Sequence, residues 1–309
     1  SYSVTGVQTC ALPIWRLPAF MAMPGPALRK ALKEPTDKRI FAVYEALARG
    51  WSVAEVHRLT AIDPWFLSMI HKARDMEVAL GASSMPLGRE ILLASKAEGF
   101  SDAQIGAASG ASEGEIRSLR ERYRIFPKVR QIDTLAAEFP AETNYLYMTY
   151  SGEGHDIEPS RGGVMVPGSG PYRIGSSVEF DWCCVNALQT ARSLGRSAIM
   201  VNCNPETVST DYDSSDRLYF EPLTLEDVLH VYRAERCDGA IVQFGGQTPL
   251  NLALGLERAG VRIVGTQPRD IEAAEDRKHF AALVERLGLK QPPSGLATSV
   301  EEAAAIAER

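Results

Sequence analysis

The sequence is poor in the features that mark secreted, metal-binding and membrane-spanning proteins. Its 5 cysteines contain no C-x-x-C pair, and Cys183 and Cys184 are adjacent on an expected helix, which argues against a disulfide framework or a zinc site. The 5 histidines are scattered without metal-ligand spacing. No apolar run reaches the roughly 20 residues of a membrane span. We therefore expect reduced thiols in a cytoplasmic protein with no metal site and no membrane contact.

Strong charge of either sign is also missing. The net charge is −6, which provides no overall basic field for nucleic acid or for an anionic membrane surface. Residues 1–14, SYSVTGVQTCALPI, lack the basic n-region and A-x-A cleavage site of a signal peptide. They are similar to translated sequencing-adapter read-through, so we expect a disordered, non-native segment.

The residues that follow predict a helical domain over 15–125. Trp15–Pro35 is rich in proline and is expected to be mostly irregular. Beyond it, polar N-cap residues alternate with glycine stops at helical spacing. The expected helices are Asp37–Ala48, Ser52 to about Leu59, Trp65–Leu80 with Gly81 as its stop, Arg89–Ala97, and two more opened by Ser101 and Ser112.

A faint internal repeat runs through this helical part. Gly50-Trp51-Ser52 recurs as Gly99-Phe100-Ser101, each time between two expected helices. The pattern is typical of a helix-turn-helix, so binding of nucleic acid must be weighed. The helix after Ser112 is charge-balanced, whereas a recognition helix presents a net basic face to phosphates. We therefore expect no nucleic-acid partner.

Residues 126–162 are expected to form a linker. Tyr145, Tyr147 and Tyr150 are interpreted as packing anchors, and Ser151–Gly163, rich in glycine and charge, is the expected domain boundary.

Residues 163–292 alternate apolar β-branched runs with helical spacing. This βαβ pattern predicts a parallel sheet, so the fold class is α + α/β, with the helical domain followed by a Rossmann-like domain. The expected strands are Gly163–Val166, Ala198–Asn202, Leu218–Phe220, Ala240–Phe244 and Arg262–Val264. The expected helices are Val178–Leu194, Leu225–Arg236, Pro249–Ala259 and Arg277–Leu287, with Thr224 and Thr248 as candidate N-caps.

Three polar or glycine-rich loops follow strands of this sheet. Ligands of parallel sheets bind at the carboxyl ends of the strands, where these loops meet. Glycine lets the backbone approach a ligand closely, and mixed amide, hydroxyl and carboxylate groups fit binding better than nucleophilic catalysis. The candidate residues are Gly168, Gly170, Arg173, Ser176, Ser177, Glu179, Asn202, Asn204, Glu206, Thr207, Asp211, Gly245, Gly246 and Gln247.

The first loop is a weak dinucleotide signature by itself. Arg173 stands where such a motif has its third glycine, and no carboxylate follows the second strand to bind a ribose. Arg173 could instead pair with Glu179 or Asp181.

Four motifs carry a resemblance to a known family: GSGPYRIGSSVEFDWC, VNCNPETVSTDYDSSDRLYFEPLTLEDV, VQFGGQTPLNLA and GTQPRDIEAAEDRKHF. Their order is similar to that in the large chain of carbamoyl-phosphate synthetase, at the segment that opens its second, carbamoyl-phosphate-forming half. The resemblance extends over about Trp15–Arg309. Pro167, which lacks a donor N–H, and Tyr172 depart from most of the family.

The resemblance implies a helical oligomerization domain, a pre-ATP-grasp domain and, over residues 293–309, the start of a truncated ATP-grasp fold. The parent enzyme is a ligase that makes carbamoyl phosphate from ATP, bicarbonate and glutamine-derived ammonia for arginine and pyrimidine biosynthesis. ATP and Mg or Mn are its cofactors, with none expected on this fragment, which is expected to be inactive alone. The implied partners are the glutamine amidotransferase small chain and other copies of the large chain.

We predict that Gly168–Val178 forms a wall beside the path of carbamate in the complete enzyme. The loop follows the first strand at the carboxyl edge of the sheet, Gly168 and Gly170 have no side-chain bulk, and Ser176 and Ser177 are small and polar. The alternative is that these small residues only let the helix from Val178 pack close to the sheet. Two other functions stay open at this point: a free-standing nucleotide-binding α/β protein, such as an NAD-dependent oxidoreductase, and a helix-turn-helix regulator with an α/β effector domain.

Overall fold

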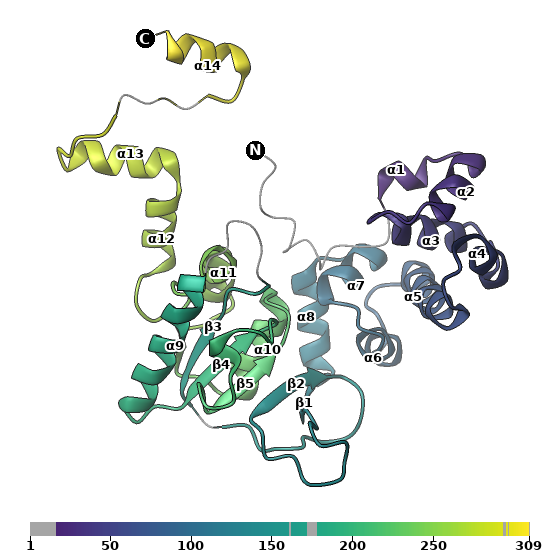
Figure 1. Cartoon of the computed structure of the whole chain (residues 1–309), viewed down its shortest axis with the longest axis horizontal. Coiled ribbons are helices and arrows are strands. Elements are labelled where there is room, and N and C mark those ends of the chain that lie inside the picture. Colours follow the sequence, from purple (N-terminus) through teal and green to yellow (C-terminus); the bar gives the residue numbers. More distant parts are fainter. Residues whose placement is uncertain (1–16, 161, 172–177, 293–294, 296, 309) are drawn as a thin grey trace. The chain divides into compact units, whose positions relative to one another are not determined.

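The computed structural model describes residues 17–160, 162–171, 178–292, 295 and 297–308. The expected non-native segment 1–14 and the candidates Arg173, Ser176 and Ser177 lie outside these residues. The chain divides into two compact units, Ser1–Pro159 and Ser160–Arg309, which are described separately (Figure 1). Within the described residues, no helix is both long enough and apolar enough to cross a bilayer.

The first unit is mainly helical, and it begins earlier than expected. Its helices are α1 (Pro18–Met21), α2 (Gly25–Lys33), α3 (Arg39–Ala48), α4 (Val53–Thr60), α5 (Pro64–Ala82), α6 (Arg89–Ala97), α7 (Asp102–Ser109) and α8 (Glu113–Arg122). The expectation of an irregular Trp15–Pro35 was therefore wrong. Proline lies in the first turn of both α1 and α2, where its fixed φ suits a helix start and its missing N–H costs nothing.

The internal repeat extends over three helices per copy, at a constant offset of 49 positions. Gly50 and Gly99 have φ of 83° and 88°. The next two N-caps, Ser52 and Ser101, each accept a hydrogen bond from the third helical N–H. The offset also relates the caps of α5 and α8, Asp63 and Ser112. We call α3–α5 repeat 1 and α6–α8 repeat 2.

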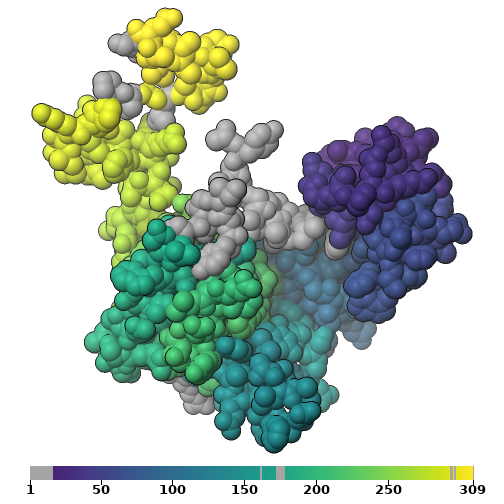
Figure 2. Space-filling view, viewed as in Figure 1, coloured from purple at the N-terminus to yellow at the C-terminus, as the bar shows by residue number. Residues whose placement is uncertain are grey.

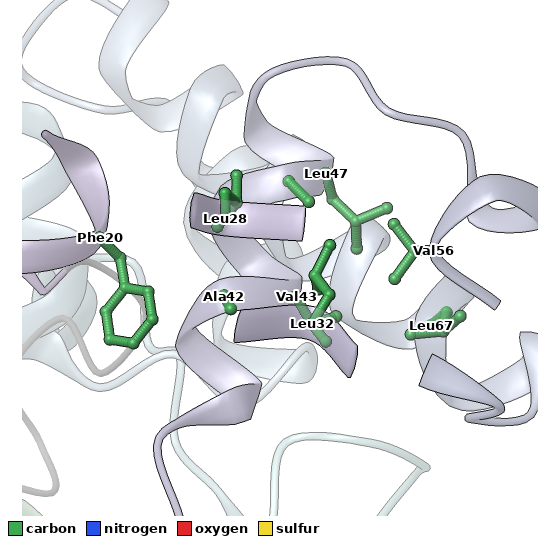
Figure 3. Close-up of a cluster of buried hydrophobic side chains, with 9 residues drawn as sticks. Phe20, Leu28, Leu32, Ala42, Val43, Leu47, Val56 and Leu67 are labelled. Atoms are coloured by element: carbon green, nitrogen blue, oxygen red, sulfur yellow. The ribbon is translucent and has the colours of Figure 1, made fainter. Parts of the chain in front are cut away.

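Each repeat builds its own apolar core. The core of repeat 1 is closed by α1 and α2, as the inward-pointing Leu28, Leu32, Val43, Leu47 and Val56 show (Figure 3). The space-filling view shows α1–α4, in purple and dark blue, as one continuous packed body (Figure 2).

Repeat 2 has a separate core, to which the C-terminal part of α5 and the segment after α8 contribute. It contains Leu80, Leu87, Leu92, Phe100, Ile105, Ile116, Leu119 and Ile125. Gly81, expected to end α5, lies inside the helix. A Cβ there would lie 3.4 Å from the Ala108 carbonyl oxygen, so the residue lets α5 and α7 pack closely.

The segment predicted as a linker, residues 126–162, contains two paired strands. Strand β1 (Lys128–Gln131) pairs antiparallel with β2 (Tyr145–Thr149). Tyr150, just after β2, packs on the core of repeat 2 and lies with its ring 5.0 Å from the Lys96 ammonium, which fits the predicted anchoring role. Tyr147 is exposed and does not fit it.

The second unit has the predicted parallel sheet. Its strands are β3 (Val164–Pro167), β4 (Ala198–Asn202), β5 (Arg217–Phe220) and β6 (Gly239–Ala240), in the order β5-β4-β3-β6. Its helices are α9 (Val178–Ser193), α10 (Leu225–Ala234), α11 (Gln247–Arg258), α12 (Pro268–Glu275), α13 (Arg277–Arg286) and α14 (Val300–Ala307). Helix α9 packs against β3 and β4 (Figure 1).

Three predictions for this unit need correction. The strand expected at Ala240–Phe244 stops at Ala240, since the chain then turns into Gly245-Gly246. The strand expected at Arg262–Val264 is one isolated bridge between Ile263 and Ala240. Thr248 lies inside α11, whose N-cap is Gly246, whereas Thr224 does cap α10.

Pro167 is the last residue of β3 and pairs with Val201. The N–H of the following Gly168 donates to the Val201 carbonyl at 2.8 Å, so the ladder continues past the missing donor.

Candidate functional site at the strand ends

The loop after β3 is held by a buried asparagine at the end of β4. Asn202 is fully buried, and its Oδ1 accepts from the N–H groups of Gly170 (2.9 Å) and Cys203 (3.0 Å). A Cβ at Gly168 would lie 2.7 Å from the Asn202 amide carbon, so only glycine fits there. Asn202, predicted as a ligand-facing residue, is enclosed and positions the backbone of the first loop.

The loop after β4 is closed by its own hydroxyl groups. The N–H of Glu206 donates to the Asn204 side chain at 3.0 Å. The buried Thr207 hydroxyl lies 2.9 Å from that of Thr210, which donates to the Asn204 carbonyl at 3.1 Å. Asn204 and Thr207 therefore shape a rigid turn, and of the two only Asn204 is partly accessible.

The loop after β6 lies against the first loop. A Cβ at Gly245 would lie 2.6 Å from the carbonyl oxygens of Pro167 and Gly168, and one at Gly246 would meet the Phe180 ring at 2.9 Å. The Thr248 hydroxyl donates to the Ser169 carbonyl at 3.1 Å. The glycines thus permit close contact between loops, and the predicted meeting of the loops at one sheet edge is observed.

The candidate carboxylates lie on the surface of this edge. Glu179, Glu206 and Asp211 are all exposed, and Gln247 is exposed with its amide donating to Asn251 at 3.0 Å. Asp181, the alternative partner weighed for Arg173, is buried and accepts from the Ser209 N–H at 3.3 Å.

Ser169 was missed from the sequence, although it stands inside the first motif. Its side chain is only 4 % exposed, and its hydroxyl has no hydrogen-bond partner among the residues that the structure describes. The sequence does place Ser169 between two glycines at the end of a strand. That position could have marked it as a candidate, but the loop was interpreted from its glycines alone.

Three of the four cysteines of this unit have raised pKa values. Burial raises the pKa of Cys184 and of Cys237 to about 12. Partial burial also raises the pKa of Cys203, the exposed cysteine after β4. Little thiolate forms at neutral pH, so the edge offers binding groups and walls.

The resemblance implies ATP and a divalent metal for the parent enzyme. Among the described residues, no three histidine, cysteine, aspartate or glutamate side chains converge as metal ligands. We assign no step involving ATP or a metal to these residues.

Comparison with known protein families identifies both units. Residues 18–124 match the model described as "Carbamoyl-phosphate synthetase large chain, oligomerisation domain". Residues 160–273 match "Carbamoyl phosphate synthase preATP-grasp domain". The two matches thus assign the helical unit to the oligomerisation-domain family and the α/β unit to the pre-ATP-grasp family.

Individual relatives agree over nearly the whole chain. The "Carbamoyl phosphate synthase arginine-specific large chain, mitochondrial" of Schizosaccharomyces pombe is 50% identical over 93% of this chain and 25% of its own length. The "Carbamoyl phosphate synthase large chain" of Myxococcus xanthus is 50% identical over 91% of this chain and 26% of its own length. The "Carbamoyl-phosphate synthase [ammonia], mitochondrial" of Rattus norvegicus is 49% identical over 89% of this chain and 18% of its own length.

The chain belongs to the carbamoyl-phosphate synthetase large-chain family, which confirms the resemblance. It spans about a quarter of the length of the first two relatives. Neither match supports the oxidoreductase or the helix-turn-helix regulator. In the helical unit, two arginines of α8 form ion pairs within the unit: Arg117 with Glu113 and Arg120 with Asp102. This pairing reduces the positive charge that α8 could present to a phosphate backbone.

Proposed function

We propose that this chain is part of a ligase that makes carbamoyl phosphate from ATP, bicarbonate and ammonia. The observation that carries this proposal is the match of two consecutive domains, in order, to one family. We further propose that the ammonia comes from glutamine through an amidotransferase small chain. The product would serve arginine and pyrimidine biosynthesis, and the enzyme would be cytoplasmic. The helical unit supports assembly with other copies of the large chain.

Binding of ATP and Mg or Mn is assigned to parts of the parent enzyme other than the described residues. Residues 293–309 would begin the ATP-grasp fold, and the helix in this segment, α14, has no buried side chain. The chain alone should hydrolyse no ATP in response to bicarbonate or carbamate. Turnover above the buffer control in a coupled assay for ADP would contradict this expectation.

The α/β unit contributes a wall beside the path of carbamate, formed by Gly168–Val178. Gly170 adds no side-chain bulk to its described part, and Ser176 and Ser177 are small and polar residues. Cys203, in the loop after β4, is exposed and lies next to Gly170. A Cβ built at Gly170 would lie 3.8 Å from the Cys203 Sγ. A bulky residue at 203 would therefore extend over this wall from an exposed position.

The test is Cys203→Phe in a full-length large chain rebuilt around this sequence. Two partial reactions should stay near the unsubstituted level: bicarbonate-dependent ATP hydrolysis by the first half, and ATP synthesis from ADP and carbamoyl phosphate by the second. Overall carbamoyl phosphate synthesis should fall by at least about tenfold, because the intermediate no longer passes.

Leu194→Phe is the matched control, since Leu194 is 74% exposed just after α9. It should leave all three rates unchanged. A parallel loss of the partial reactions and the overall rate in Cys203→Phe would show damage to the fold and overturn the wall.

A further inference from the structure

The loop between β1 and β2, residues 132–144, exposes large apolar side chains. Residues 133–140 are all exposed, among them Leu135 at 44% and Phe139 at 69%. Neither family model covers this loop, since one match ends at residue 124 and the other begins at residue 160. Exposed apolar side chains are informative where they gather in one place, and here two of them lie on one short loop.

A single carboxylate fixes the backbone of this loop. Asp133 accepts hydrogen bonds from the N–H groups of Leu135 at 2.8 Å and of Ala137 at 2.6 Å. Ala136 and Ala137 have φ of 53° and 59°, in the left-handed region that residues with a Cβ disfavour. The β1–β2 pairing holds the two ends of the loop together. An ordered loop with a strained backbone and exposed apolar side chains is typical of a binding element rather than of a spacer.

The charge of the loop indicates what it could bind. Residues 132–144 contain Asp133, Glu138 and Glu142 but no lysine, arginine or histidine. Glu138 and Glu142 are exposed, on either side of Phe139. A surface with two apolar side chains among negative charges complements an apolar pocket that has lysine or arginine at its rim.

We propose that Leu135 and Phe139 insert into such a pocket on a part of the large chain that lies outside this sequence. This inference rests on the proposed function, in which the chain is part of a longer ligase. The chain spans about a quarter of the length of two of its relatives, so most of such a polypeptide is available to supply the pocket. A pocket on the same polypeptide is present at high effective concentration, so two apolar anchors suffice for a lasting contact.

The first test compares amide hydrogen exchange of the loop in two chains by mass spectrometry. One is this chain alone, and the other is a full-length large chain rebuilt around this sequence. The amides of residues 134–142 should exchange at least about tenfold more slowly in the full-length chain, because the docked loop is covered. Equal exchange in the two chains would overturn the proposal. Slow exchange in this chain alone that depends on its concentration would also overturn it, because the partner would then be a second copy.

The double variant Leu135→Asp with Phe139→Asp tests whether the two apolar side chains are the anchors. In the full-length chain it should raise loop exchange to the rate that the same variant shows in this chain alone. Both side chains are exposed, so the fold should be retained, as circular dichroism would verify. Phe126→Asp, at a 46% exposed site outside the loop, is the matched control and should leave the loop protected. Protection that survives the double variant would overturn the proposal.

Charge reversal tests the chemistry of the pocket rim. Glu138→Lys with Glu142→Lys should speed loop exchange in the full-length chain by at least about threefold, and less so at high salt. Glu153→Lys, exposed and outside the loop, is the control and should leave this exchange unchanged. A charge reversal without effect would overturn the basic rim. A full-length chain that makes carbamoyl phosphate while its loop exchanges freely would refute the docking and leave the proposed function standing, so the two failures are distinguishable.

Discussion

The two helical repeats have the same local backbone signals but stabilise equivalent positions in opposite ways. Repeat 2 buries an ionic cluster: Asp102 accepts from Arg120 at 3.0–3.1 Å and lies 3.3 Å from the Lys96 ammonium, with all three side chains at most 2% exposed. In repeat 1, Leu47 and Val53 stand for Lys96 and Asp102, and both belong to the apolar cluster. The comparison shows that this arrangement of helices does not depend on the chemistry of its interior.

The two repeats also differ on their outer surfaces. Repeat 1 has an apolar interior and an apolar groove outside, between α3 and α5, whereas repeat 2 has charges in both places, with Arg89 and Glu115 outside. A buried charge cluster needs every partner, while an apolar core tolerates exchange if volume is kept. The repeats should therefore respond differently to matched substitutions.

Removing the shared anion should have the largest effect. Asp102→Ala leaves the Arg120 and Lys96 cations buried without that carboxylate, which should cost about 3–5 kcal/mol in the free energy of unfolding. Urea unfolding followed by circular dichroism measures this value. A loss below about 1 kcal/mol, the level of a surface pair, would show that the cluster is solvated.

Replacing the whole cluster by apolar residues should restore most of that loss. The triple variant Lys96→Leu, Asp102→Val and Arg120→Met gives repeat 2 the interior of repeat 1, with methionine at 120 because His71, its counterpart, is partly exposed. Well-packed apolar substitutes for buried ion pairs are often neutral or stabilising by about 1–4 kcal/mol. Here the Phe100 and Ile125 carbonyls lose donors, so we expect stability between Asp102→Ala and wild type. A triple variant less stable than Asp102→Ala would contradict the equivalence of the two interiors.

An exchange at the helix ends should give a smaller, reciprocal effect. Ala61 and Gly110 hold the same left-handed C-cap, with φ of 57° and 75°. Alanine is strained there and glycine is not, so Ala61→Gly should stabilise and Gly110→Ala destabilise, each by about 1 kcal/mol. Thermal unfolding of both variants tests this, and shifts of the same sign would contradict it.

The smallest expected effect is on how the free energy of unfolding decreases at acidic pH, which we call the acid limb. Hydrogen bonds from the Ser112 hydroxyl and N–H hold the pKa of Glu115 below its ordinary value of 4.5. A lowered folded pKa means that this contribution is complete above the ordinary pKa and is lost as pH falls through the folded one. Glu115→Gln should remove that part of the acid dependence while keeping the capping box. The repeat 1 counterpart is Phe66, so Phe66→Gln is the control and should leave the acid limb unchanged.

Local signals explain which parts of the fold were predictable. The caps at Ser101, Ser112 and Thr224 depend on neighbours three residues away and are observed as predicted. The length of β6 depends on how its neighbours in the sheet end, and the strand predicted at Ala240–Phe244 was too long. The pairing of Asp102 with Arg120 spans 18 positions and has no local signature.

The candidate site was predictable in position more than in detail. Strand order places the three loops at one edge. There the Gly170 N–H donates to the Asn202 side chain, and the Thr248 hydroxyl donates to the Ser169 carbonyl. Packing decides which polar groups form hydrogen bonds inside the loops and which remain exposed to solvent, and the sequence does not show this. Asn202 and Thr207 are enclosed, whereas Glu206 stays exposed.

The proposed role in carbamoyl phosphate synthesis is tested most directly by replacement within a relative. In the large chain of Myxococcus xanthus, the region aligned with residues 18–292 would be exchanged for that of this chain. Formation of carbamoyl phosphate from ATP, bicarbonate and ammonia would then be measured. The chimera should synthesise carbamoyl phosphate at a rate within about tenfold of the unmodified enzyme. A folded chimera that retains both partial reactions but makes no carbamoyl phosphate would contradict the account.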